Sequence, residues 1–185
     1  MQNYQRRLFL CLSLIVMVNA FHSTFAGSDE RVTMDGANLT VKAPAGWTRA
    51  PVLGETPILK FWLCDPHQPN GCLVRAELTL TQLSTVQAPN SLDAQMASWS
   101  KTPASQIVEA PQRTSLGKHD AIELVTQGPW SYHVKELVFF DAAVLHDGNT
   151  YYLCSMKTDP AEYTALRSVF KNFCSSVRFS AANPE

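Results

Sequence analysis

The chain has 185 residues, 45% of them hydrophobic, and a formal net charge of −1 from 15 basic and 16 acidic residues. This length and composition are typical of one globular domain with a substantial core. A mildly acidic chain without a polybasic stretch lacks the electrostatic footprint of proteins that bind nucleic acids or anionic lipids. We therefore expect neither kind of partner.

The first 26 residues have the pattern of a secretory signal peptide. Arg6 and Arg7 form a charged segment, residues 8–18 are apolar, and small residues lead to an expected cleavage site after Ala26. Cleavage after Ala20 is the alternative. The sequence therefore predicts export to the periplasm or to the exterior of the cell.

Two other interpretations of this segment involve the membrane. The apolar run is shorter than the about 20 residues that a transmembrane helix needs. Cys11 follows a leucine rather than the small residue of a lipidation motif. We therefore expect no stable membrane anchor after cleavage, a globular domain over residues 27–180 and a frayed tail at 181–185.

Alternating apolar residues predict three strands in the first half of that domain. The first contains Leu39 and Val41, and the second contains Leu59, Phe61 and Leu63. The third extends over residues 73–83. There Ala76, Leu78 and Leu80 are expected inside, and Arg75, Glu77, Thr79 and Thr81 outside. The turn-rich residues 65–71 between the second and third strands indicate a hairpin.

A short helix is expected over residues 92–100, with Ser91 as its N-cap. Four more strands are expected near residues 107–115, 121–126, 132–142 and 150–157. Asp147 and Gly148 give the signal of a hairpin turn before the last of these strands.

The last helix has the strongest signals. Asp159 is its expected N-cap, Pro160 its first residue, and Glu162 completes a capping box. An apolar stripe at helical spacing follows, which should face a sheet; it consists of Tyr163, Leu166, Val169, Phe170 and Phe173. The element order predicts an α+β fold in which helices flank an antiparallel sheet, an α/β/α sandwich.

The domain carries four cysteines, which an oxidising compartment would pair as disulfides. Cys64 and Cys72 flank the predicted hairpin, and Cys154 lies on a strand that precedes the helix with Cys174. Of the three possible connectivities, we predict Cys64–Cys72 and Cys154–Cys174. The alternative is a zinc site at Cys64, His67 and Cys72, but it lacks a fourth ligand at a familiar spacing.

No catalytic motif is present: the sequence has no nucleophile elbow, no metalloprotease helix and no phosphate-binding loop. His119 and His146 each precede an aspartate and could act as general bases. Both pairs neighbour glycines, and this context is typical of solvated turns. We predict no catalytic residue, no cofactor and no metal.

Two loops carry weak binding signals. Residues 128–133 contain Trp130 and Tyr132, aromatic types that often anchor protein interfaces. His67 lies in the loop that the first disulfide would close, and cross-linking lowers the ordering cost of binding. The alternatives are that Trp130 packs back on the sheet and that the hairpin is only a structural element.

Two segments resemble proteins of the PsbP-like superfamily. Residues 41–47 (Val-Lys-Ala-Pro-Ala-Gly-Trp) are similar to the opening of those proteins. Residues 151–153 (Tyr-Tyr-Leu), a capped helix and residues 173–179 (Phe-Cys-Ser-Ser-Val-Arg-Phe) are similar to their ending. The resemblance covers residues 39–179 and implies an α/β/α sandwich. Members of this superfamily are mainly binding scaffolds without shared catalytic residues, so it implies no particular site residue.

From these observations we predict an exported, non-enzymatic module that binds a protein partner as an adaptor or inhibitor. One specific version is a periplasmic immunity protein that neutralises a delivered toxin. The alternatives are an accessory subunit of an envelope assembly and a hydrolase that uses His119 or His146.

Overall fold

The computed structural model describes residues 30–37, 39–52, 58–67, 71–85, 87–129, 137–147 and 150–179. The predicted signal peptide, Trp130, Tyr132 and the predicted tail lie outside these residues. Among the described helices, none is long and apolar enough to cross a membrane.

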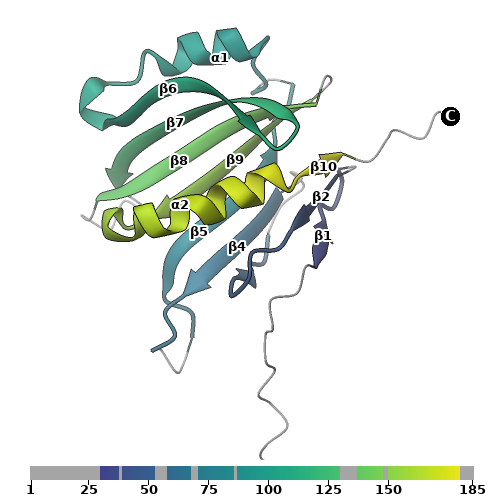
Figure 1. Ribbon diagram of the computed structural model, residues 1–185, viewed down its shortest axis with the longest axis vertical. Helices are drawn as coiled ribbons and strands as arrows, with labels where there is room; N and C mark the ends of the chain where they lie inside the picture. Colours follow the sequence, from purple (N-terminus) through teal and green to yellow (C-terminus); the bar gives the residue numbers. More distant parts are fainter. Residues whose placement is uncertain are drawn as a thin grey trace, which may run out of the picture.

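A seven-stranded antiparallel sheet, with strand order β3-β4-β5-β9-β8-β7-β6, is the central layer (Figure 1). Each strand from β5 to β9 pairs with its neighbours in antiparallel register, and alternate residues of β5 and β9 such as Leu78, Leu80, Cys154 and Met156 are buried. The strands are β3 (Thr48–Arg49), β4 (Ile58–Cys64), β5 (Val74–Gln82), β6 (Ile107–Leu116), β7 (His119–Pro129), β8 (Leu137–His146) and β9 (Tyr151–Thr158).

A second, three-stranded sheet has the order β1-β2-β10. It consists of β1 (Arg31–Thr33), β2 (Leu39–Lys42) and β10 (Arg178–Phe179). Neither β1 nor β3 has enough residues for an apolar alternation, which is why the periodicity analysis did not predict these strands. Phe179 pairs with Leu39, so the beginning and the end of the described chain meet in this sheet.

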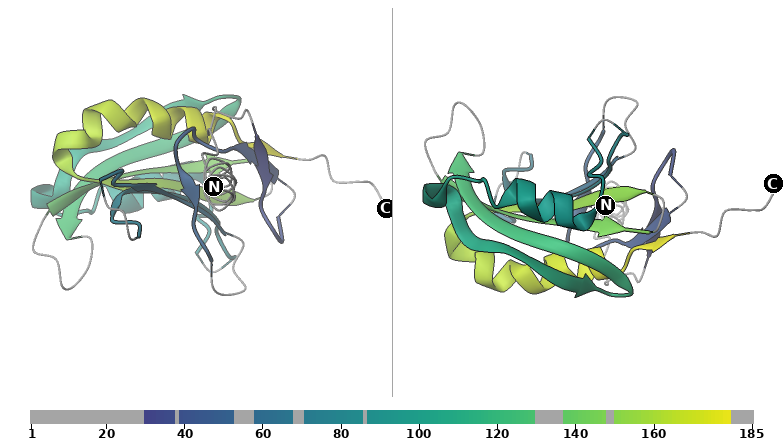
Figure 2. Two further views of the ribbon diagram at one scale, coloured as in Figure 1. Left: turned by 90° about the horizontal axis from the view of Figure 1, so that it is seen from below. Right: turned by 90° about the horizontal axis from the view of Figure 1, so that it is seen from above.

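The two α-helices lie on opposite sides of the large sheet (Figure 2). The short helix α1 (Leu92–Trp99) lies over one face, where Trp99 and Val144 line the same cavity. The long helix α2 (Pro160–Ser175) covers the other face, where Tyr163 bonds Asp141. A 3-10 turn, η1 (Ala104–Gln106), precedes β6. The predicted α/β/α arrangement is therefore confirmed.

Both predicted N-caps are present. The Ser91 side chain accepts a hydrogen bond from the N–H of Ala94, and the Asp159 side chain accepts one from the N–H of Ala161. The predicted capping box is wrong, because the Glu162 carboxylate instead accepts hydrogen bonds from the Arg75 guanidinium on β5. A charged partner on the neighbouring sheet therefore replaces the local contact.

Three predicted strand limits need correction. β7 begins at His119, because Gly117 and Lys118 alone form the turn after β6. Gly117 adopts φ +66°, and a Cβ there would lie 2.5 Å from the carbonyl oxygen of Ser175, so the turn can pack on the end of α2. β7 also extends to Pro129, and β8 extends to His146 rather than ending at residue 142.

The core lies between the large sheet, α2 and the small sheet. The predicted apolar stripe of α2 is confirmed: Tyr163, Phe170 and Phe173 are buried, and Leu166 and Val169 pack beside them. The Phe173 ring meets Phe61 of β4 edge to face, with ring centroids 5.6 Å apart.

Both predicted disulfides are present. Cys64 and Cys72 close the β4–β5 hairpin with Cα atoms 5.0 Å apart, and this bond leaves no thiolates for the zinc alternative. Cys154 and Cys174 join β9 to α2, with Cα atoms 6.1 Å apart and both residues fully buried.

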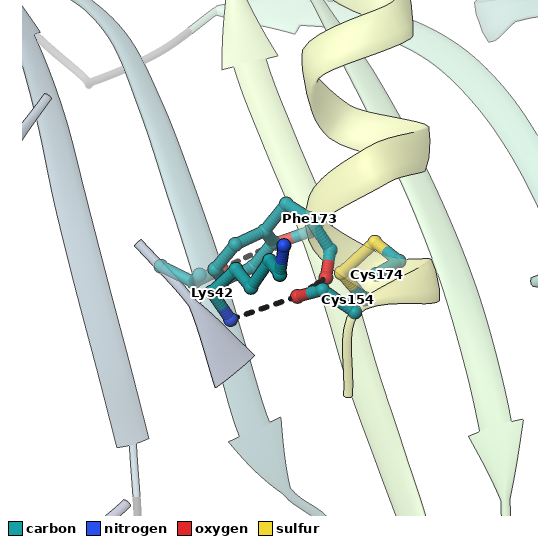
Figure 3. The surroundings of a disulfide bond; sticks show 7 residues. Lys42, Cys154, Phe173 and Cys174 are labelled. Carbon is teal, nitrogen blue, oxygen red and sulfur yellow. Dashed lines mark hydrogen bonds between the residues drawn. A yellow bond between two sulfur atoms is a disulfide. The ribbon is translucent and has the colours of Figure 1, made fainter. Parts of the chain in front are cut away.

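The C-terminal end of α2 is fixed by further bonds around the second disulfide (Figure 3). The backbone N–H of Lys42 donates to Ser176 Oγ at 2.9 Å, and the Ser176 hydroxyl donates to the carbonyl of Phe173 at 2.7 Å. The Arg31 guanidinium donates to the carbonyl of Ser176 at 2.6 Å. A cation at this helix end also complements the helix dipole.

A layer of charged residues lies beside the apolar core, under the middle of α2. Glu123 of β7 and Asp141 of β8 are almost completely buried. Lys171 Nζ lies 2.6 Å from Glu123 Oε2, and Arg167 binds Glu109 with both terminal nitrogens. These bonds fix the helix on the sheet by charge as well as by apolar packing.

Asp141 is the least well compensated member of this layer. Its Oδ2 accepts from the Tyr163 hydroxyl at 2.9 Å, whereas its buried Oδ1 has no donor among the described residues. Burial, and secondarily the charge of Glu123, raise the pKa of Asp141 to about 7. Near neutral pH Asp141 is therefore partly protonated.

We predict that the buried disulfide contributes more stability than the hairpin disulfide. Cys154→Ser/Cys174→Ser should lower the free energy of unfolding by about 3 kcal/mol, and Cys64→Ser/Cys72→Ser by about 2.5 kcal/mol or less, because the first bond closes the longer loop. Urea denaturation of both variants measures this. A larger loss for the hairpin variant would contradict the prediction.

We also predict that Asp141 makes the protein less stable as the pH rises from about 4 to about 7. In this window the unfolded chain releases a proton that folded Asp141 keeps, so folding is favoured at the acidic end. Asp141→Asn should remove this dependence, which amounts to up to about 4 kcal/mol.

The measurement is urea denaturation across this pH range for wild type and variant. Asp120→Asn, on an exposed side chain of β7, is the matched control and should keep the wild-type slope. Equal slopes in wild type and Asp141→Asn would show that Asp141 ionises normally.

Candidate binding surface

The part of the large sheet that faces away from α2 has a half that α1 does not cover. The strand register places Trp62 of β4, Glu77 of β5, Lys157 of β9 and Phe140 of β8 in one row across four neighbouring strands. Lys60, Thr79 and Ser155 form most of the next row. We call these seven residues the open sheet surface.

Glu77 is the centre of this surface. It is only 8% exposed, although the alternation of β5 predicted an outward side chain. The residue does point away from the main core, but long side chains from β4 and β9 cover it. The predicted outward direction of Glu77 is therefore correct. Its burial was not predicted, because neighbouring strands contribute the cover and alternation within one strand does not reveal them.

Each oxygen of the Glu77 carboxylate has a donor. The Trp62 indole N–H donates to Oε2 at 3.1 Å, and Lys60 Nζ lies 3.4 Å from the same oxygen. Lys157 Nζ donates to Oε1 at 3.3 Å and lies 5.9 Å from the centre of the Phe140 ring. One buried carboxylate thus holds two lysines and a tryptophan in place.

Two exposed leucines lie at one end of the large sheet, and the register places Leu137 on the same side as Phe139, which contacts Tyr163 of α2. Leu73, just before β5, is 58% exposed, and Leu137, the first residue of β8, is 53% exposed. Ala76 and Phe139 both pair with Thr158 of β9, so β5 and β8 begin at the same end, about 10 Å apart at the spacing of two strands. We call these two residues the leucine rim.

His67 and the strands that flank the other predicted binding residues lie at this same end. His67 is exposed in the disulfide-closed hairpin, and its backbone N–H donates to Asp65 Oδ1 at 2.9 Å. Trp130 and Tyr132 lie outside the described residues, but the strands on either side of them meet here, since Pro129 pairs with Leu137. The described ends of β4, β5, β7 and β8 on either side of the two predicted loops therefore lie at one end of the sheet.

The two candidate histidines make structural contacts elsewhere. His119 Nε2 lies 3.2 Å from the carbonyl oxygen of Val177, and its ring contacts Phe179 edge to face. His146 stacks on Tyr151 with ring centroids 4.4 Å apart. The interpretation of both as solvated turn residues is wrong, because each belongs to a strand. Within the described ranges, no group of three His, Cys, Asp or Glu side chains could hold a metal ion.

Two cavities lie away from the open sheet surface. One, of about 440 Å³, lies between β1 and the turn before Trp47. Its two arginines are bonded within the protein: Arg49 to Asp35, and Arg31 to Thr40 and Ser176. The other, of about 430 Å³, separates α1 from the sheet and has only uncharged residues in its lining. Neither brings together groups for acid–base or nucleophilic chemistry.

Sequence reasoning did not find the open sheet surface. Outward positions on β4 and β5 were available from the alternation, but Lys60, Glu77 and Lys157 come together only once the order β4-β5-β9 is known. Glu77 and Lys157 are 80 residues apart in the sequence, so no local pattern indicates that they are in contact.

No protein-family model and no curated protein sequence matches this chain. Solved structures do. Cyanobacterial PsbP from Synechocystis is 12% identical, with a TM-score of 0.52, over 84% of this chain and 95% of that one. The Ran-binding protein Mog1p of Saccharomyces cerevisiae is 12% identical, with a TM-score of 0.50, over 82% and 95%.

A structure from Bacteroides thetaiotaomicron has a TM-score of 0.55 at 12% identity over 82% of this chain, which spans 48% of that protein. Identities this low establish the fold alone. The strand order, the two flanking helices and these neighbours agree with the resemblance seen in the sequence: the protein has a PsbP-like fold.

Proposed function

We propose that this protein is an exported, non-enzymatic module that binds a protein partner, as an adaptor or an inhibitor. It acts in the periplasm or outside the cell after removal of residues 1–26. The two disulfides, which suggest an oxidising, extracytoplasmic environment, support this location.

The observation that carries the proposal is the leucine rim at one end of the sheet whose uncovered face is the open sheet surface. Single exposed apolar residues are ordinary on protein surfaces. Here the two most exposed of the large apolar residues described flank one end of a sheet that also presents Trp62 and Phe140. Apolar and aromatic side chains next to cationic ones are typical of protein interfaces.

The hairpin disulfide gives this end of the sheet a second suitable property. Cys64–Cys72 closes the loop that carries His67, directly before Leu73, and a cross-linked loop loses less entropy on binding. In this proposal His67, Trp130 and Tyr132 belong to the contact region, together with the leucine rim.

Inhibition of a delivered toxin is one version of this function, and stabilisation of an envelope assembly is another. The two versions differ in the partner and not in the surface. An isolated toxin would be recovered as a complex of two proteins, whereas an assembly would be recovered with several subunits.

We expect Leu73→Asp/Leu137→Asp to abolish partner binding without unfolding the protein. Both side chains are more than half exposed, so the change costs little core packing, whereas two charges in an interface should weaken binding at least tenfold. The measurement is affinity capture from native extracytoplasmic extract with the oxidised wild type and the variant, quantified by mass spectrometry.

Val52→Asp is the matched control. Val52 is 39% exposed and lines the same surface region as Ile58, at the opposite end of β4. A protein captured by wild type and control but not by the double variant is the expected result. Capture that the double variant retains in full would place the interface elsewhere, and the lack of any specific captured protein would contradict the binding function itself.

A further inference from the structure

We propose that Lys60 and Lys157, held by Glu77, form a binding site for a carboxylate side chain of an acidic segment in a protein partner. This inference rests on the proposed function and specifies the chemistry of the partner. It follows from the geometry of the open sheet surface and not from any sequence motif.

Both lysines have donors to spare. An ammonium group has three N–H donors, and the Glu77 carboxylate lies within reach of one of them on each lysine, at 3.4 Å for Lys60 and 3.3 Å for Lys157. The two side chains are 28% and 33% exposed. Their remaining donors are therefore available to an acceptor that arrives from solvent.

The two ammonium groups lie on either side of one carboxylate. Lys60 contacts Oε2 and Lys157 contacts Oε1, so Glu77 sets the spacing between two otherwise flexible side chains. Holding them in place before binding reduces the conformational entropy that an incoming anion must offset. Trp62 fixes the orientation of the carboxylate from the β4 side.

The charges of this group do not cancel. Two lysines surround one glutamate, and the adjacent Thr79 and Ser155 hydroxyls are uncharged and bond each other at 2.5 Å. A local excess of one positive charge remains, in a chain with a net charge of −1. The complementary ligand is therefore an anion, and its binding should weaken as salt screens the charges.

Apolar neighbours favour a protein carboxylate over a free ion. Trp62 and Phe140 lie in the same row as Glu77 and Lys157. A glutamate or aspartate next to apolar residues can contact the lysines and these side chains at once. A small inorganic anion would use only the lysines.

The test uses the Trp62 indole N–H as a reporter in two-dimensional NMR of the oxidised protein. This N–H donates to Glu77, so an anion that draws the lysines away from Glu77 should shift its signal. The signal is assigned with Trp62→Phe. The probes are a blocked peptide, Gly-Glu-Leu-Leu-Glu-Gly, the same peptide with glutamine in place of glutamate, and inorganic phosphate.

We expect the glutamate peptide to shift the Trp62 signal in a saturable manner and the glutamine peptide to bind at least tenfold more weakly. Lys60→Met and Lys157→Met should each lower the affinity for the glutamate peptide at least tenfold. Lys118→Met is the matched control, because it removes the same charge at an exposed turn between β6 and β7, and it should leave binding unchanged.

Three outcomes would overturn the inference. Equal binding of the two peptides would show an apolar surface that does not select carboxylates. If phosphate saturates the shift of the Trp62 signal at a lower concentration than the glutamate peptide does, the site is one for small anions. Lysine variants that bind the glutamate peptide like the wild type would place the site elsewhere.

The proposed function can fail separately from this inference. Selective lysine-dependent peptide binding combined with partner capture that survives Leu73→Asp/Leu137→Asp would contradict only the leucine rim as the interface. Loss of capture in that variant, combined with equal binding of the two peptides, would contradict only the carboxylate site.

Discussion

The attachment of α2 to one face of the large sheet is the constraint on which the rest of the structure depends. The buried Cys154–Cys174 bond fixes the helix to β9, and the apolar stripe and the Arg167 and Lys171 contacts extend that attachment along its length. The small sheet then packs against the same helix through Lys42 and Ser176. Because α2 and the small sheet close one face, only the opposite face carries α1 and the open sheet surface.

Both faces of the sheet carry buried acids, but their surroundings give them different roles. Asp141 and Glu123 lie under a helix, where their cations come from α2 and the cost of burial appears as a raised pKa of Asp141. Glu77 lies on the uncovered face, and its cations remain about one-third exposed. The same type of buried ion pair therefore holds the fold together on one side and keeps donors accessible on the other.

Local signals predicted the elements well and their assembly poorly. The caps at Ser91 and Asp159, the stripe of α2 and both disulfides followed from spacing along the chain, because each depends on residues close in sequence or on a single helix docking event. The partner of Glu162 and the burial of Glu77 depend on which strands become neighbours. For the same reason the candidate surface could not be predicted.

Hydrogen–deuterium exchange of the oxidised protein, alone and saturated with its captured partner, tests the central claim most directly. If the open sheet surface and the leucine rim form the interface, protection should increase in residues 58–67, 71–77 and 137–140 and stay unchanged in α1 and β6. Protection confined to α1, or to the small sheet of β1, β2 and β10, would contradict this account of how the protein binds.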